Sequence, residues 1–283
     1  MRFAAALVFW LATTLGLAVA VPVAWVQQNV VNEDGCAAMA REAAVDPALQ
    51  SAVAAELTTW AMALIADQGV QRYPVDSSTV HDAAVAFTAG RSFPPLFAQA
   101  SRAAHRWLFT DPRGQDGDQW VVDIAPMLKE SSFREILSRY DVEAPAKLTV
   151  PLSVSASQPL QRGELSRIAV WGPWLTIGVI VLSGGCGMLT LVAARGRGRA
   201  LSSLGVSTLL VGAAGWAGVE VGSRYIDDAL NRTTGDIRRI AEVLVTHAVG
   251  RVHLWFSLTL AAGAALVVCG ALVAMLGGLR NSG

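Results

Sequence analysis

Charged residues are scarce in this sequence. Of its 283 residues, 16% are Asp, Glu, Lys or Arg, whereas a typical soluble chain has about 25%. The shortage is local, because four long apolar runs contain none of these residues: Phe3–Val26, Ile168–Ala194, Leu201–Val219 and Val252–Leu279. A helix needs about 20 apolar residues to cross a bilayer. The sequence therefore predicts a mainly α membrane protein with four transmembrane helices.

Cysteine and histidine are also rare. There are three cysteines and four histidines, with no Cys–His pair and no spacing typical of a metal site. Cys36 lies outside the apolar runs, whereas Cys186 and Cys269 lie inside them, which excludes a disulfide bond to Cys36 within one chain. Cys36 is then either a small inert residue or a link to another chain. We expect no metal ion and no cofactor.

Catalytic motifs are absent too. The sequence has no G-x-S-x-G, S-x-x-K, H-E-x-x-H, phosphate-binding loop or dinucleotide fingerprint. This weakens an enzymatic interpretation without excluding one. The best candidate pair is His105, on a predicted helix, with Asp123, which stands alone in an apolar strand. A structural hydrogen bond between them is the favoured interpretation over catalysis.

The arginines that are present indicate an orientation. Arg195, Arg197 and Arg199 lie between two apolar runs, and short arginine-rich loops stay on the cytoplasmic side. Both termini are then cytoplasmic as well, and every acidic side chain lies outside. Five arginines between Glu220 and Arg251 argue the other way. The tighter cluster favours the first orientation, with a topology signal as the simplest role of these arginines and a cytoplasmic docking site as the alternative.

The first apolar run has two interpretations. Arg2 and the sequence AVA at Ala18–Ala20 resemble parts of a cleavable signal peptide. The run is longer than the apolar core of a signal peptide and continues to Val26, so an uncleaved anchor is favoured.

These observations predict seven segments. They are an N-terminal transmembrane anchor (1–26), an extracytoplasmic domain (27–167), transmembrane helix 2 (168–194), a cytoplasmic arginine-rich hairpin (195–200), transmembrane helix 3 (201–222), an extracytoplasmic helical segment (223–251) and transmembrane helix 4 (252–279).

The domain at 27–167 is expected to be mostly helical with a small β element. Asp46 and Pro47 begin a helix that Gly69 ends, a second helix begins near Ser92, and a third follows Ser131. The ranges Trp120–Ile124 and Lys147–Val154 are predicted strands, with Pro151 indicating an edge or a break. The domain has 17 acidic and 12 basic side chains, which argues against nucleic acid as a partner.

The last helix is predicted to run from Asp236 through the fourth apolar run. Ile240, Val243, Leu244 and His247 form a stripe on it that would contact the outer domain.

Small residues predict close helix packing. Gly218 and Gly222 form a GxxxG motif, and Gly263, Gly270 and Gly277 recur every seven residues. Packing within one chain is favoured, although an oligomer remains possible. No ionisable residue lies at the centre of a run, which disfavours transport by this chain alone.

Three stretches carry a family resemblance: FPPLFAQASRAAHRWLF, WVVDIAPML and the arginine hairpin. In these the chain resembles actinobacterial integral membrane proteins of unknown function, which have one N-terminal span, an extracytoplasmic domain and three further spans. The resemblance covers most of the chain after about Val45. It departs at Ser101, where Asn is usual, and at Phe97, where Trp is usual. It implies this topology and an actinobacterial cell-envelope setting, and it carries no known catalytic residue to this chain.

The leading functional prediction is non-catalytic. The protein would be an envelope scaffold, sensor or accessory subunit that sits in the lipid bilayer and binds a protein or lipid through its outer domain. One alternative is an envelope enzyme that uses His105 and Asp123. Another is a subunit of a lipid or solute exporter.

Overall fold

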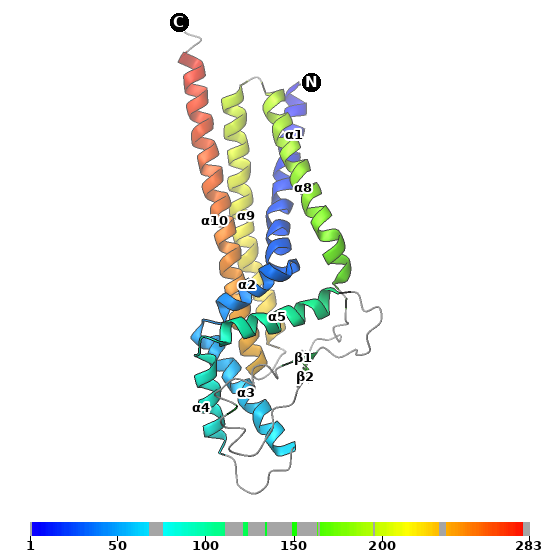
Figure 1. Ribbon diagram of the computed structural model, residues 1–283. Coiled ribbons are helices and arrows are strands. Elements are labelled where there is room, and N and C mark those ends of the chain that lie inside the picture. The colour runs from blue at the N-terminus through cyan, green and yellow to red at the C-terminus, as the bar shows by residue number, and fades with distance from the viewer. Residues whose placement is uncertain are drawn as a thin grey trace. The chain divides into compact units, whose positions relative to one another are not determined.

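The computed structural model divides into two compact units (Figure 1). The structure describes residues 2–67, 76–110, 165–194, 196–231 and 236–279, together with 121–123, 134, 149–151 and 163. The first unit, here called the span unit, comprises Met1–Gln28, Val170–Tyr225 and Val249–Gly283. The second, here called the helical domain, comprises Asn29–Ala169 and Ile226–Ala248. The two outer segments expected from the sequence therefore contribute to one unit.

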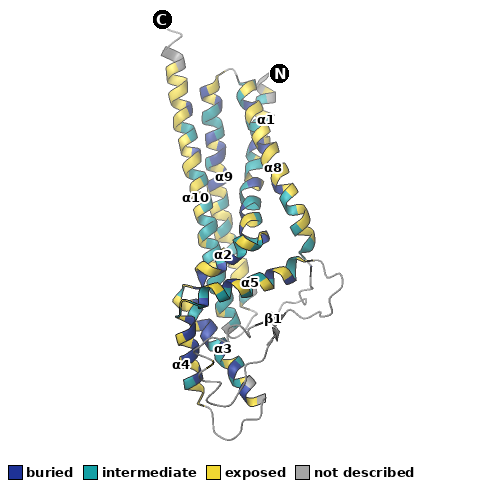
Figure 2. Ribbon diagram, in the orientation of Figure 1, coloured by how far each residue is buried: buried dark blue, intermediate teal, exposed yellow. Residues whose placement is uncertain are grey.

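Four long helices supply the span unit: α1 (Arg2–Val26), α8 (Ser166–Ala193), α9 (Arg197–Leu230) and α10 (Asp236–Leu279). Among the described residues, four helices are long and apolar enough to cross a membrane, which confirms the predicted mainly α membrane architecture. The start of α1, the end of α10 and the connection from α8 to α9 lie at one end of this unit (Figure 1). Much of the surface of α8 is exposed apolar side chain, as expected for a helix in contact with lipid (Figure 2).

The third span helix is longer at both ends than hydropathy indicates. The sequence predicts a hairpin over 195–200 and a helix over 201–222, whereas α9 runs from Arg197 to Leu230. Hydropathy marks the part of a helix that is apolar, but backbone hydrogen bonding continues into its polar ends. Arg197 and Arg199 are therefore exposed side chains on the first turn of α9.

Polar side chains join α1 to α9. The indole N–H of Trp10 donates to the carbonyl oxygen of Ser203 over 3.0 Å. The hydroxyl of Thr14 donates to the hydroxyl oxygen of Ser207 over 2.9 Å, and Ser207 is completely buried. Hydrogen bonds between helices satisfy polar groups that lipid cannot satisfy, and they stabilise the pairing.

Glycines bring α9 and α10 together. A Cβ atom added at Gly205 would lie 2.8 Å from the carbonyl oxygen of Gly263, and one added at Gly198 would lie 2.7 Å from that of Gly270. No real side chain tolerates backbone atoms at these distances, so only glycine permits this approach.

The helical domain begins where the first span helix ends. A π-helical turn, η1 (Gln27–Val31), follows α1 and leads into α2 (Glu33–Ala43), whose first turn is capped by the side chain of Asn32. Then come α3 (Pro47–Asp67), α4 (Ser77–Thr88) and α5 (Phe93–Phe109). The predicted starts near Asp46 and Ser92 are confirmed, and the side chain of Asp46 accepts a hydrogen bond from Ala48 N–H over 2.8 Å. The sequence did not predict α2 or α4.

A hydrophobic core fills the space between α3, α4 and the start of α5. Phe87 and Phe93 are nearly inaccessible, and their rings meet edge to face with centroids 5.6 Å apart. The predicted stripe on α10 packs against this core through Ile240, Val243 and Leu244, which confirms that contact. The helical domain therefore has its own core, to which a chain segment from beyond α9 contributes.

Two short strands complete the described part of this unit. β1 (Val121–Asp123) pairs antiparallel with β2 (Thr149–Pro151), with Val122 opposite Val150, and β1 lies beside α5. Both strands lie within the ranges expected for strands. The helix expected after Ser131 lies outside the described residues, apart from Arg134.

Candidate functional site

His105 is held by backbone carbonyl groups. Its Nε2 lies 3.0 Å from the carbonyl oxygens of both Val30 and Val31 in η1. Because carbonyl oxygens only accept, Nε2 carries the hydrogen and donates it to both. The ring is buried and stacks on Phe109 at a centroid distance of 4.2 Å. His105 therefore satisfies carbonyl groups at the end of η1, which is a structural task.

The expected partner of His105 can be placed only in part. Asp123 is the last residue of β1, and its side chain lies outside the described residues. The pairing of His105 with Asp123, whether structural or catalytic, stays a prediction. The Nε2 atom of His105 has its partners elsewhere, in η1.

Charged side chains line a cleft between α2 and α5. The guanidinium of Arg102 donates to Asp34 over 3.0 Å, and that of Arg106 donates to Glu33 over 2.9 Å. The cleft has a volume of about 330 Å³. It is lined by Asp34, Ala37, Ala38, Arg41, Glu42, Val45, Ala98 and Arg102. The sequence could have indicated this site through α2, since Asn32 followed by Glu33 and Asp34 is typical of a helix start.

Among the described residues of the helical domain, two groups have shifted pKa values. Burial, with a smaller effect of the Glu33 carboxylate, raises the pKa of the Cys36 thiol above its ordinary value. Hydrogen bonds from Ser78, through its side chain and its backbone, lower the pKa of the exposed Asp76 carboxyl group, which caps α4. At neutral pH Cys36 is thus a protonated, weakly nucleophilic thiol.

His247 of α10 approaches the carboxylate that caps α3. Its Nδ1 donates to the carbonyl oxygen of Val243 over 3.0 Å, and its Nε2 lies 3.8 Å from Asp46. This contact adds a polar attachment to the apolar packing of α10 on the core.

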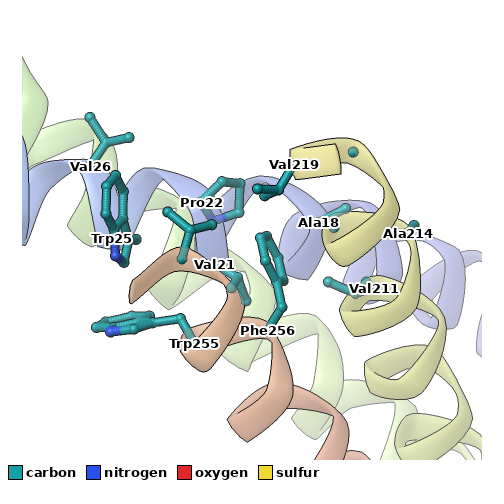
Figure 3. A pocket seen from close by; sticks show the side chains of 13 residues that line it. Ala18, Val21, Pro22, Trp25, Val26, Val211, Ala214, Val219, Trp255 and Phe256 are labelled. Carbon is teal, nitrogen blue, oxygen red and sulfur yellow. The ribbon is translucent and has the colours of Figure 1, made fainter. Parts of the chain in front are cut away.

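An apolar cavity lies inside the span unit, between α1, α9 and α10 (Figure 3). Its volume is about 480 Å³. None of its lining residues is ionisable, and the rings of Trp25 and Trp255 contribute to it from α1 and α10. The lining comprises Ala18, Val21, Pro22, Trp25, Val26, Val211, Ala214, Gly215, Gly218, Val219, Val252, Trp255 and Phe256. Sequence reasoning missed this cavity, because three separate helices form it.

The glycines singled out in the sequence divide into two groups. Gly263 and Gly270 lie at the close approach of α10 to α9, whereas an added Cβ at Gly218 or Gly222 would meet no described atom within 4 Å. Gly277 lies in α10, and its surroundings are outside the described residues. The partners of Gly263 and Gly270 are Gly205 and Gly198, which the sequence reasoning did not single out.

The arginines of the predicted hairpin and the possible metal ligands form no further candidate site in the described part of the chain. Arg197 and Arg199 are exposed on α9, and Arg195 lies outside the described residues. No group of three His, Cys, Asp or Glu side chains suited to a metal ion occurs in the described part of the chain.

Comparison with known proteins gives no family assignment. The chain matches no protein-family model, no curated protein and no solved structure.

Proposed function

We propose that this chain is a non-catalytic membrane protein whose helical domain faces the cell envelope and binds a protein partner through the α2–α5 cleft. In this proposal α1, α8, α9 and α10 span the plasma membrane, with both termini in the cytoplasm. The resemblance to actinobacterial integral membrane proteins of unknown function supports a cell-envelope setting. The observation that carries the proposal is the cleft itself, with its volume of about 330 Å³ and its charged rim.

The chemistry of the cleft favours a protein over a lipid. Its lining holds Asp34, Arg41 and Glu42 from α2 and Arg102 from α5, so the formal charges cancel. An anionic headgroup would require a surplus of positive charge, and a hydrocarbon chain would have to desolvate four charged groups. The exposed side chain of Val45 adds a small apolar contact beside these charges. A mixture of arginine, paired charge and exposed apolar surface is typical of protein interfaces.

The orientation has support from the first turn of α9. Arg197 and Arg199 lie at a helix N-terminus, where the helix dipole disfavours positive charge. Their presence there is therefore not explained by helix stability. Retention on the cytoplasmic side of a membrane is a sufficient reason for them.

Photo-crosslinking in intact cells tests the partner site. A photoreactive amino acid replaces Ala38, an exposed residue on the cleft wall. We expect a discrete crosslinked product with a second polypeptide. Arg41→Glu should reduce that product several-fold because it reverses a charge in the cleft. Arg239→Glu is the matched control, since it reverses an exposed charge of the same domain on α10.

Equal amounts of the crosslinked product in the two charge-reversal variants would contradict the proposed site. Crosslinks to lipid alone would also contradict it.

A further inference from the structure

The cavity of the span unit exists because small residues face it. Ala18 on α1 and Ala214 and Gly218 on α9 carry at most a methyl group. An added Cβ at Gly218 would meet no described atom within 4 Å, so the space that a side chain of this residue would occupy is open. At Gly215, one turn earlier, an added Cβ would collide with the ring of Phe256. Phe256 therefore closes one part of the α9–α10 contact and leaves the part beside Gly218 hollow.

The walls of the cavity are suited to hydrocarbon. They consist of aliphatic and aromatic side chains from three helices that are long and apolar enough to span a membrane. The only side-chain hydrogen-bonding groups among them are the indole N–H groups of Trp25 and Trp255. Tryptophan is enriched where a membrane meets water. An acyl chain entering from the lipid would thus meet apolar walls, with the indole rings of Trp25 and Trp255 near each other at one end (Figure 3).

The volume is too small to enclose a partner helix. A helix with its side chains is about 10–12 Å wide and rises about 5.4 Å per turn, so one turn displaces about 400–600 Å³. A transmembrane partner needs about 20 residues, or five to six turns. The cavity, at about 480 Å³, holds the volume of roughly one turn. It does lie within the range of about 300–1,000 Å³ in which proteins bind small ligands.

We propose that this cavity holds one acyl chain of a membrane lipid, seated between α1, α9 and α10 with Gly218 on its wall. The lipid is a ligand of the span unit and is independent of the protein partner of the α2–α5 cleft. An empty cavity would lose the dispersion contacts that its walls make with a bound chain. The site therefore retains its lipid longer than the exposed surface of α8 does.

Labelling by a photoreactive lipid tests the proposal. The full-length protein is reconstituted in vesicles of phosphatidylglycerol and phosphatidylethanolamine, with a diazirine at the end of one acyl chain. We expect the label to concentrate on peptides of α1, α9 and α10 that line the cavity. Gly218→Leu should reduce this labelling about tenfold, because the leucine side chain displaces several methylene groups of the acyl chain.

Gly222→Leu is the matched control. It also adds a leucine where an added Cβ meets no described atom within 4 Å, but Gly222 does not line the cavity. Labelling in this variant should equal that of the unaltered protein. If Gly218→Leu fails to elute as a single species, Ala18→Leu fills the same cavity from α1 and is expected to lower the labelling likewise.

Three results would overturn the proposal. The first is labelling spread over α8, where Trp174 is 72% exposed, as strongly as over the cavity. The second is equal labelling of the Gly218→Leu and Gly222→Leu variants. The third is a cavity labelled by a free fatty acid with the same diazirine but not by the phospholipid, which would assign the site to another source of hydrocarbon.

Discussion

His105 is a titratable residue whose ring nitrogen Nε2 is used in hydrogen bonds to backbone carbonyl groups. The sequence singles it out as a candidate acid–base group, and the structure gives its Nε2 two carbonyl partners, Val30 and Val31. Its position on a helix was foreseeable from the sequence, whereas its burial was not predicted. Its partners were not, because η1 is more than 70 residues away in the chain and has no sequence signature.

We expect His105→Ala to destabilise the helical domain by about 1–3 kcal/mol, since it leaves two carbonyl groups without their donor. Thermal unfolding followed by circular dichroism in detergent micelles measures the change. His105→Gln keeps amide N–H donors and should recover part of the loss. Unaltered stability in His105→Ala, combined with a lost cellular phenotype, would instead indicate chemistry at this residue.

The thiol of Cys36 should react slowly near neutral pH. Its pKa is raised above the ordinary value, first by burial and then by Glu33, so the thiolate forms only at higher pH. The rate of alkylation by iodoacetamide, measured against pH in a chain with Cys186→Ala and Cys269→Ala, should have its midpoint above that of an ordinary thiol. Because the pKa of the Cys36 thiol is higher in the folded than in the unfolded chain, the protonated thiol stabilises the fold at low pH. This stabilisation is lost as the pH rises from the thiol pKa of the unfolded chain through that of the folded chain.

A pair of substitutions separates the two causes of this shift. Glu33→Gln should lower the midpoint slightly, because it removes the negative charge that makes the smaller contribution to the raised pKa of Cys36. Arg106→Ala breaks the same ion pair but leaves the charge of Glu33 in place, so it should not lower the midpoint. A midpoint at the ordinary value in the chain with only Cys186→Ala and Cys269→Ala would show that the Cys36 thiol is not partly buried.

At the scale of helices, the predictions succeeded where side chains carry strong signals. Asp46 and Pro47 mark the start of α3, and the acidic N-terminus at Asp236 marks that of α10. The helix α2 escaped prediction because alanines supply its buried face, at positions 37, 40 and 43. Alanine is apolar but small, so it contributes little to a periodic hydrophobic pattern. The apolar cavity of the span unit escaped prediction for a related reason. It exists because residues such as Ala18, Ala214 and Gly218 have small side chains or none.

The contact of α9 with α10 should not tolerate a methyl group. We expect Gly205→Ala to destabilise the span unit by about 1–3 kcal/mol, because its Cβ would lie 2.8 Å from a backbone oxygen. Gly184→Ala on α8 is the control, as its Cβ would meet no described atom within 4 Å and alanine favours helix. Thermal unfolding of both variants in the same detergent measures their stabilities relative to the unaltered protein. Equal stability of the two would mean that the helices do not approach each other this closely.

At the scale of the whole molecule, four apolar helices are foreseeable from composition, and their orientation is open to a direct test. Cysteines introduced at Gly196 and Ala86 report on the two sides of the membrane. Both positions are exposed, and a Cβ added at Gly196 would meet only the side chain of Arg199, at 4.0 Å. Gly198 would be a poor choice, because a Cβ there would lie 2.6 Å from the backbone of Ala274.

In a chain whose three natural cysteines are replaced by alanine, an impermeant thiol reagent applied to intact cells should label Ala86→Cys and spare Gly196→Cys. Lysed cells should show labelling at both positions, which controls for reactivity. Labelling of Gly196→Cys alone in intact cells would invert the orientation and would remove the envelope-facing partner site from the proposal.

The regular glycine spacing of α9 and α10 could allow one helix to shift along the other by seven residues. Gly198 faces Gly270 and Gly205 faces Gly263, and each pair is seven residues from the next. A slip of one heptad, about 10 Å along the axis, would pair glycine with glycine again, now Gly205 with Gly270. The same slip would move Leu260 from Gly212 to Val219, where a side chain blocks it. Val219, a wall of the cavity, thus also opposes a slip of the two helices in this direction.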